Sequence, residues 1–319
     1  MMILKYTEAA VAMMLAVSGA ASALCQASAD SLANVRLLVD SGRVVEADTA
    51  LHSYLVAHQS DADAHFLLGY VLFREKKPRE SLAEFTTGAR YRRPNAGELK
   101  IVASDYVLLD DFADADKWFT QVVAEAPDDA NASYLLGRTK FNENDFPAAI
   151  SSFEHAIALH PRYVEAENNI GLAWKELNEP EKARSAFQTA IEWQSDLPVD
   201  AQPFLNLGTL LADQNNLDAA IPFLEKAADL APDNPSIHEE LSHIYTALQN
   251  LPKAQSELER AVALAPNISS LHFKLGQIYR KEGMRDRAQQ EFAICEKLIG
   301  AHSSDKTPNP ISIRSTPDR

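Results

Sequence analysis

A pattern with a period of 34 residues runs through most of this chain and limits what it can fold into. In residues 130–163 it reads as two amphipathic helices joined by a short polar turn. Small residues, one aromatic residue and a proline recur at fixed positions of the unit; in residues 130–163 these are Gly137, Ala149, Phe153, Ala156 and Pro161. One helix pair cannot bury its apolar faces alone, so the pattern predicts an all-α fold of stacked pairs.

Each of these positions has a physical role. Gly137 and Ala149 are small, and we expect the two helices of the pair to cross closely there. A Gly137→Leu change should overpack this crossing, at a cost of roughly 1–3 kcal/mol. Phe153 and Ala156 lie three residues apart on the second helix, where a large residue beside a small one forms a surface against which the next pair can pack. Pro161 removes a backbone donor, so the second helix must end before it.

The period and the marked positions resemble those of tetratricopeptide repeats (TPRs). This resemblance implies a right-handed superhelical solenoid over residues 30–302, of about eight helix-turn-helix repeats. Positions are counted from the first residue of each repeat, so Gly137 is position 8 of the repeat that begins at Ala130. The first repeat lacks a glycine at position 8 and is expected to act as a terminal cap. The repeats are predicted near residues 28–61, 62–95, 96–129, 130–163, 164–197, 201–234, 235–268 and 269–302.

The two ends of the chain differ in composition from the repeats. Residues 1–29 carry Lys5, an apolar run and two small-residue sites where a signal peptide could be cut, the second just before Asp30. This predicts a bacterial-type exported protein, periplasmic or secreted, with an uncleaved N-terminal membrane anchor as the alternative. Residues 303–319 contain three prolines and few apolar residues, and are predicted to be a disordered tail.

Composition narrows the classes of partner and chemistry. The formal net charge of -15 and the pI of about 5.0 argue against nucleic acid, whose phosphates require an excess of Lys and Arg. The two cysteines, Cys25 and Cys295, imply no disulfide framework. Cys295 occupies a position where other repeats carry alanine, so we expect a buried thiol.

No catalytic or metal-binding motif stands out within the repeats. The sequence has no glycine-rich phosphate loop, no nucleophile elbow and no CxxC pair. His238 and His243 are five residues apart, which places them on different faces of a helix and argues against a zinc pair. His65, His238 and His272 share one position of three repeats and are predicted to be packing residues. We therefore expect no enzyme activity, no cofactor and no metal.

The TPR resemblance also indicates where a partner would bind. In TPR proteins, positions 2, 5, 9, 12 and 13 of each first helix line the concave face, which holds an extended peptide or a partner helix. Aromatic residues with arginine are the composition that binding hot spots favour. Phe66, Phe73 and Phe141 could instead be buried against a neighbouring repeat. The candidate partner-binding residues are Phe66, Tyr70, Phe73, Arg74, Lys100, Asn131, Tyr134, Arg138 and Phe141.

Two functions remain open from the sequence. The favoured one is a non-enzymatic scaffold or adaptor that binds a protein or peptide in its groove, with peripheral association with a membrane complex. The alternative is a substrate-recruiting or regulatory subunit of a separate envelope enzyme, such as a glycosyltransferase or a peptidase. The two differ in whether the partner is itself an enzyme.

Overall fold

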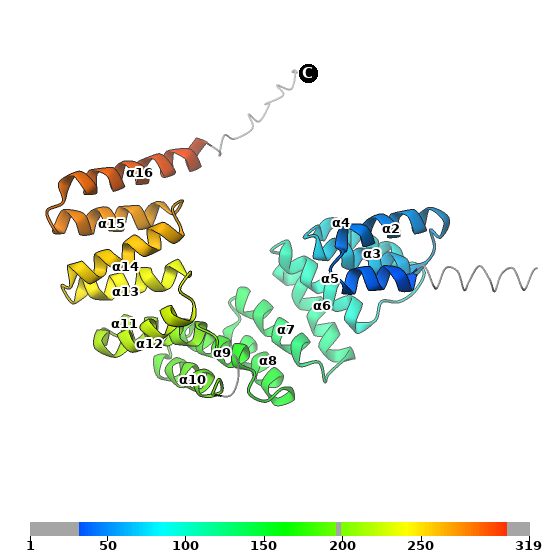
Figure 1. The fold of residues 1–319 in the computed structure, drawn as a ribbon. Coiled ribbons are helices and arrows are strands. Elements are labelled where there is room, and N and C mark those ends of the chain that lie inside the picture. The colour runs from blue at the N-terminus through cyan, green and yellow to red at the C-terminus, as the bar shows by residue number, and fades with distance from the viewer. Residues whose placement is uncertain (1–31, 196–198, 305–319) are drawn as a thin grey trace, which may run out of the picture. The chain divides into compact units, whose positions relative to one another are not determined.

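The computed structural model describes residues 32–195 and 199–304, and every regular element in these ranges is a helix (Figure 1). The helices follow one another in pairs joined by short turns, which confirms the predicted all-α fold of about eight helix pairs. Within the described residues, no helix combines the length and the apolar character needed to span a membrane. The predicted export signal and residues 305–319 of the predicted tail lie outside these ranges.

The chain divides into two compact units, of which the first is Met1–Pro161. Two of its helices that begin a pair contact each other, since α3 (Ala62–Arg74) lies against α5 (Ala96–Leu108) as well as against α4 (Pro78–Gly88). These two helices therefore share one side of the unit. Among its described residues the unit holds four helix pairs: a helix over residues 32–40 with α2 (Val44–Ala57), α3 (Ala62–Arg74) with α4 (Pro78–Gly88), α5 (Ala96–Leu108) with α6 (Phe112–Glu125), and α7 (Ala130–Asn142) with α8 (Phe146–Leu159).

The second unit is Arg162–Arg319. Its apolar core runs through consecutive pairs, because each second helix packs against the first helix of the next pair. In its described part it also holds four pairs: α9 (Val164–Glu176) with α10 (Pro180–Glu192), α11 (Gln202–Asp213) with α12 (Leu217–Leu230), α13 (Pro235–Ala247) with α14 (Leu251–Leu264), and α15 (Ser269–Lys281) with α16 (Arg285–Ser304).

In the pairs that begin with α3, α7, α9, α11 and α15, a glycine of the first helix makes room for a large apolar residue of the second helix. A Cβ atom added to Gly137 would lie 2.6 Å from Cδ1 of Phe153, and one added to Gly276 would lie 2.6 Å from Cε1 of Phe292. Phe153 is fully buried. Its ring therefore fills the crossing within its own pair.

The turn inside each pair adopts a left-handed backbone that the sequence pattern did not reveal. In the turn after α3, Lys76 has a φ angle of 59°, and the backbone N–H of Lys77 donates to the carbonyl of Leu72 at 2.9 Å. Glycine and asparagine tolerate this conformation best. At Lys76, Asp110 and Gln249 this conformation is adopted by residues other than glycine or asparagine, so the backbone is strained at these positions.

The histidines at position 4 connect the two helices of a pair to the preceding loop. In His238, Nδ1 lies 2.7 Å from Oε2 of Glu257 and Nε2 lies 3.0 Å from the carbonyl of Pro232. His65 and His272 repeat this arrangement with their own partners. All three histidines are buried, which agrees with the prediction that they are packing residues. Each also lies between a glutamate carboxylate and a backbone carbonyl.

The core beneath α3, α4 and α5 contains one buried carboxyl group. The Ser81 hydroxyl lies 2.8 Å from the Gly69 carbonyl and 2.5 Å from Oδ2 of Asp105, and Asp105 is fully buried. A hydroxyl has a single proton to donate, so both contacts are satisfied when the Asp105 carboxyl is protonated and donates to Ser81. Oδ1 of Asp105 has no hydrogen-bond partner, which also favours the neutral form.

The last helix, α16, combines a buried thiol with exposed apolar side chains. Cys295 is buried, which confirms the sequence prediction. Ile294 and Ile299 are 39% and 56% exposed.

Candidate functional site: a hollow on the N-terminal unit

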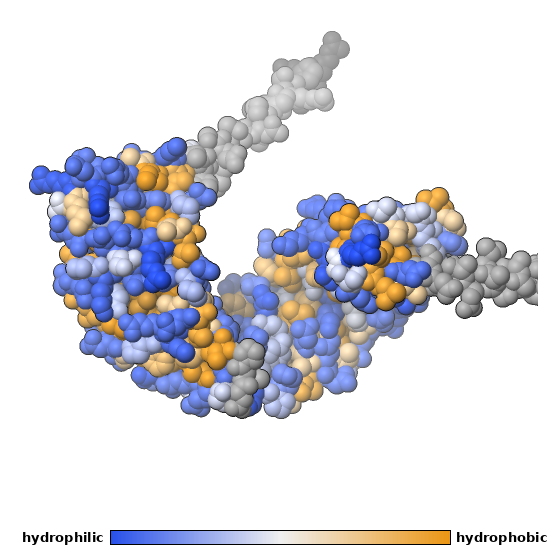
Figure 2. Space-filling model, viewed as in Figure 1, coloured by the Kyte–Doolittle hydropathy of each residue, from blue (hydrophilic) through white to orange (hydrophobic). Residues whose placement is uncertain are grey.

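A hollow of about 290 Å³ lies on the N-terminal unit, where the first turns of α3 and α5 meet. It combines aromatic and aliphatic walls with charged groups at its rim. In the space-filling view, apolar side chains gather over the N-terminal helices and surround a few strongly hydrophilic atoms (Figure 2). The residues that line the hollow are Arg36, Asp63, Phe66, Leu67, Tyr70, Phe85, Asn95, Gly97, Glu98 and Ile101.

Side-chain caps fix the two helix starts that frame the hollow. Asp61 precedes α3, and its Oδ1 accepts hydrogen bonds from the backbone N–H groups of Asp63 at 3.0 Å and Ala64 at 3.2 Å. Asn95 precedes α5 and forms a capping box with Glu98, in which each side chain accepts from the other residue's backbone N–H. These caps satisfy donors that would otherwise be orphaned, so both helix starts are held in place.

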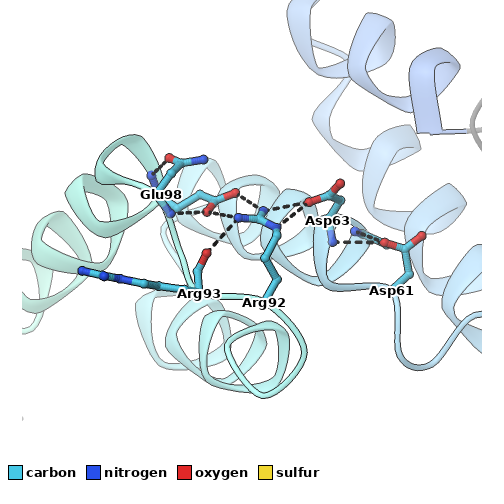
Figure 3. A network of polar contacts seen from close by, with 7 residues as sticks. Asp61, Asp63, Arg92, Arg93 and Glu98 are labelled. Atoms are coloured by element: carbon cyan, nitrogen blue, oxygen red, sulfur yellow. Dashed lines mark hydrogen bonds and ion pairs between the residues drawn. The ribbon is translucent and has the colours of Figure 1, made fainter. Parts of the chain in front are cut away.

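Arg92 neutralises the two carboxylates of the hollow (Figure 3). Its Nη2 atom lies 2.7 Å from Oδ1 of Asp63 and 2.6 Å from Oε1 of Glu98. Its guanidinium also lies 4.5 Å from the centre of the Phe66 ring. Glu98, and to a lesser extent Asp63, raise the pKa of the Arg92 guanidinium above its usual value against the opposing effect of burial. Asp63 and Glu98 therefore have less capacity to attract a cationic ligand.

Phe66, one of the candidate partner-binding residues, lines the hollow but offers little surface. It is 3% exposed and stacks on Phe85 with ring centres 5.8 Å apart. Gly88 explains the burial, because a Cβ atom there would lie 2.7 Å from Cε1 of Phe66, and its absence lets the ring sink into the core. Phe66 is thus a wall of the hollow, and the alternative of burial holds for it.

The other two candidate phenylalanines are half-buried. Phe141 packs edge-on against Phe146, with ring centres 5.3 Å apart. Phe73 lies near the end of α3. Both therefore combine packing with partial exposure.

Two tyrosine–arginine pairs stand on the first helices. On α3, Nη1 of Arg74 donates to the Tyr70 hydroxyl at 3.1 Å, and the Arg74 guanidinium lies 5.8 Å from the ring centre. On α7, the Arg138 guanidinium lies 6.0 Å from the centre of the Tyr134 ring. Both arginines are exposed and both tyrosines are half-buried, so each ring is held by the core while its arginine faces solvent.

Lys100 and Asn131 have different surroundings. Nζ of Lys100 lies 2.6 Å from Oδ2 of Asp129, the residue that caps α7, and is therefore already paired. Asn131 is exposed in the first turn of α7. We refer to Tyr70 and Arg74 of α3 together with Asn131, Tyr134 and Arg138 of α7 as the first-helix face.

The sequence did not point to Arg36, Arg92, Glu98 or Ile101. Arg36 belongs to the degenerate first repeat, where the pattern is weakest, and Arg92 lies after the end of α4. The capping-box pattern Asn-x-x-Glu at Asn95 and Glu98 was a usable signal for Glu98. No group of three or more His, Cys, Asp or Glu side chains in the described part of the chain is placed to hold a metal ion.

Comparison with known families decides the class of the chain. A profile described as tetratricopeptide repeat matches residues 32–96, 134–196 and 175–235, more than half of the sequence, and a second TPR profile matches residues 211–275. The chain belongs to the tetratricopeptide repeat family. TPR folds are usually non-catalytic and typically act as scaffolds for protein–protein interaction.

A curated relative shares part of the TPR array. Protein FlbA of Caulobacter vibrioides is 30% identical over 123 residues, which cover 39% of this chain and 20% of FlbA. The matched segment therefore spans only a fifth of the relative's length.

Solved structures share the fold at low identity. A TPR protein from Parabacteroides merdae superposes with a TM-score of 0.63 at 18% identity, over 79% of this chain and 99% of that one. The Cut9–Hcn1 hetero-tetramer of the APC/C gives a TM-score of 0.57 at 16% identity, over 86% and 54%. Pseudomonas aeruginosa PilF gives 0.55 at 14% identity, over 70% and 99%. At these identities the likeness concerns the fold.

Proposed function

We propose that this TPR protein is a non-enzymatic scaffold that binds a protein or peptide partner through its N-terminal unit. The observation that carries the proposal is the first-helix face, where Tyr70 and Tyr134 are anchored in the core and each is paired with an exposed arginine. Anchored aromatic residues lose little conformational freedom on binding, and aromatic–arginine surfaces are typical of interface hot spots. The Cut9 structure, which shares the fold, is an assembly with another protein, Hcn1.

The structure also determines which side chains can be changed to test this proposal. Arg74 and Arg138 are exposed and Tyr70 is half-buried, so a triple alanine variant removes binding surface. Tyr70 also packs on the core, so the circular dichroism of the variant is compared with that of the parent. Phe66 is left unchanged because its loss would open the core. The same unit offers a chemically matched control in Tyr91, Arg79 and Arg90, which are exposed and lie outside the hollow.

The experiment compares partners cross-linked to the full chain in the cells that produce it. We expect mass spectrometry to recover a protein with the parent and with the Tyr91/Arg79/Arg90 variant, but not with the Tyr70/Arg74/Arg138 variant. A partner that all three forms retain equally would refute the first-helix face as the binding site. A captured glycosyltransferase or peptidase would make this chain a recruiting subunit of that enzyme.

We further propose that the protein is exported, with an N-terminal anchor as the alternative, and that it acts in or beside a membrane complex of a bacterial envelope. The apolar run and cutting sites of residues 1–29 support this proposal. Fractionation followed by mass measurement of the intact chain tests it. A periplasmic or secreted form that begins at Asp30 is expected, and a full-length cytosolic form would contradict export.

A further inference from the structure

Arg36, Arg74 and Arg138 of the N-terminal unit form no ion pair with any other residue that the structure describes. Arg36 lines the hollow and has no hydrogen-bond partner among residues 32–195. Arg74 and Arg138 lie beside the tyrosines of their own helices, at 3.1 Å to the Tyr70 hydroxyl and 6.0 Å to the centre of the Tyr134 ring. An arginine guanidinium offers five donors in a planar fork that matches a carboxylate. These three side chains therefore present unused donors beside aromatic rings.

Three carboxylates at the starts of α3, α5 and α7 are already paired with cations. Asp63 and Glu98 share Arg92, at 2.7 and 2.6 Å, and Asp129 is paired with Lys100 at 2.6 Å. The hydrogen bond from Lys100 and those from backbone N–H groups lower the pKa of Asp129 below its usual value, although burial opposes the shift. These three acids are thus paired, while Arg36 and Arg74 beside the hollow have no ion pair among the described residues, in a chain whose formal net charge is -15. This arrangement favours an acidic ligand at the hollow.

The hollow beside Arg36 is suited to an apolar side chain. Its walls include Phe66, Phe85 and Ile101, and its volume of about 290 Å³ approaches that of a small ligand pocket. Tyr70 lies at the edge of the hollow and connects it with Arg74 one turn further along α3. An occupant that places an apolar group in the hollow therefore has Arg36 and Arg74 within the same neighbourhood.

We propose that the N-terminal unit recognises an acidic segment of a partner protein, in which one aromatic or aliphatic side chain enters the hollow and flanking carboxylates pair with Arg36 and Arg74. The inference rests on the proposed scaffold function and names the chemistry of the partner. The carboxylates are side chains within the segment, so recognition does not depend on a free chain end.

The test selects binders from a phage-displayed library of random dodecapeptides on the full chain. We expect the enriched peptides to contain an aromatic or aliphatic residue next to Asp or Glu. A synthetic peptide of the enriched sequence should bind Arg36→Gln about threefold to tenfold more weakly than the parent, as loss of a partly exposed charge-assisted contact implies. Arg79→Gln removes the same charge from an exposed site on α4 and should leave binding unchanged.

The outcomes separate this inference from the proposed function. One outcome would overturn the acidic ligand but support the scaffold function. In it, the peptides fail to bind the Tyr70/Arg74/Arg138 variant, but they carry no acidic residues or bind Arg36→Gln as tightly as the parent. Peptides that bind the triple variant as tightly as the parent would overturn both. A library that yields no enriched sequence would count against both as well.

Discussion

Replacement of Asp105 by Asn is the change whose effect the structure predicts in most detail. Asp105 is fully buried between the helices that carry the hollow, and its polar partner is the Ser81 hydroxyl. Burial raises the pKa of the Asp105 carboxyl to about 7, from an ordinary value of 3.8, and the Ser81 hydrogen bond only partly offsets this rise. The folded protein therefore holds a proton at pH 5–6 that the unfolded chain has already lost.

The sign and size of the pH dependence follow from this difference. Between pH 4 and pH 7 the native state binds the extra proton, so the free energy of unfolding falls as pH rises through this range. Below and above the range the Asp105 contribution is flat. A pKa difference of about 3 units corresponds to roughly 4 kcal/mol lost between the two limits. Asparagine has the same shape and does not ionise, so Asp105→Asn should lack this loss.

Trp118 offers a local probe of the first unit. It is half-buried and packs on the cluster that contains Phe66, Phe85 and Val102. The chain has three tryptophans, so replacement of Trp174 and Trp193 by Phe leaves Trp118 as the sole indole. Urea unfolding followed by its fluorescence at pH 5 and pH 8 then compares the midpoints of the parent, Asp105→Asn and the control Asp128→Asn.

We expect the midpoint of the parent and of Asp128→Asn to fall between pH 5 and pH 8 by more than that of Asp105→Asn. At pH 8 the Asp105→Asn protein should be the more stable one. An equal change of midpoint in parent and Asp105→Asn would refute the assignment of a neutral, buried Asp105. Asp128 is exposed, so its replacement controls for the loss of one carboxylate.

Three further changes test the packing, each by urea unfolding followed by circular dichroism. Gly137→Leu should destabilise by about 1–3 kcal/mol, because even a Cβ there lies 2.6 Å from Phe153; unchanged stability would contradict the close crossing. Lys76→Gly should stabilise by about 1 kcal/mol, since its φ is 59°, and a loss would contradict backbone strain. His238→Leu should lower the free energy of unfolding by about 1–3 kcal/mol, because it removes the donor to Glu257. Unchanged stability would contradict a stabilising role of that hydrogen bond.

The helix pairs were predictable because the residues that define them act locally. Gly137, Phe153 and Pro161 specify a crossing and a helix end within one repeat, and these requirements recur wherever the pattern recurs. The TPR resemblance also made Tyr70 and Arg74 candidates for partner binding, because it assigns fixed positions of each first helix to the concave face. These elements needed no information about distant parts of the chain.

The hollow was not predictable to the same degree because its residues come from three repeats. Arg36 lies in a repeat too degenerate to align reliably, and Arg92 reaches Asp63 across 29 residues of sequence. The burial of Phe66 depends on Gly88, a departure from the alanine common at that position. Asp105 carries no sequence mark of burial, since a carboxylate normally predicts exposure.

Photo-cross-linking from the first-helix face tests the central claim most directly. The full chain would carry p-benzoylphenylalanine at Tyr70 in one form and at Tyr91, an exposed tyrosine outside the hollow, in the other. We expect a discrete cross-linked partner from position 70 that is absent from position 91, and that disappears when Arg36 and Arg138 are changed to Gln. No product from position 70, or the same products from both positions, would contradict partner binding at this face.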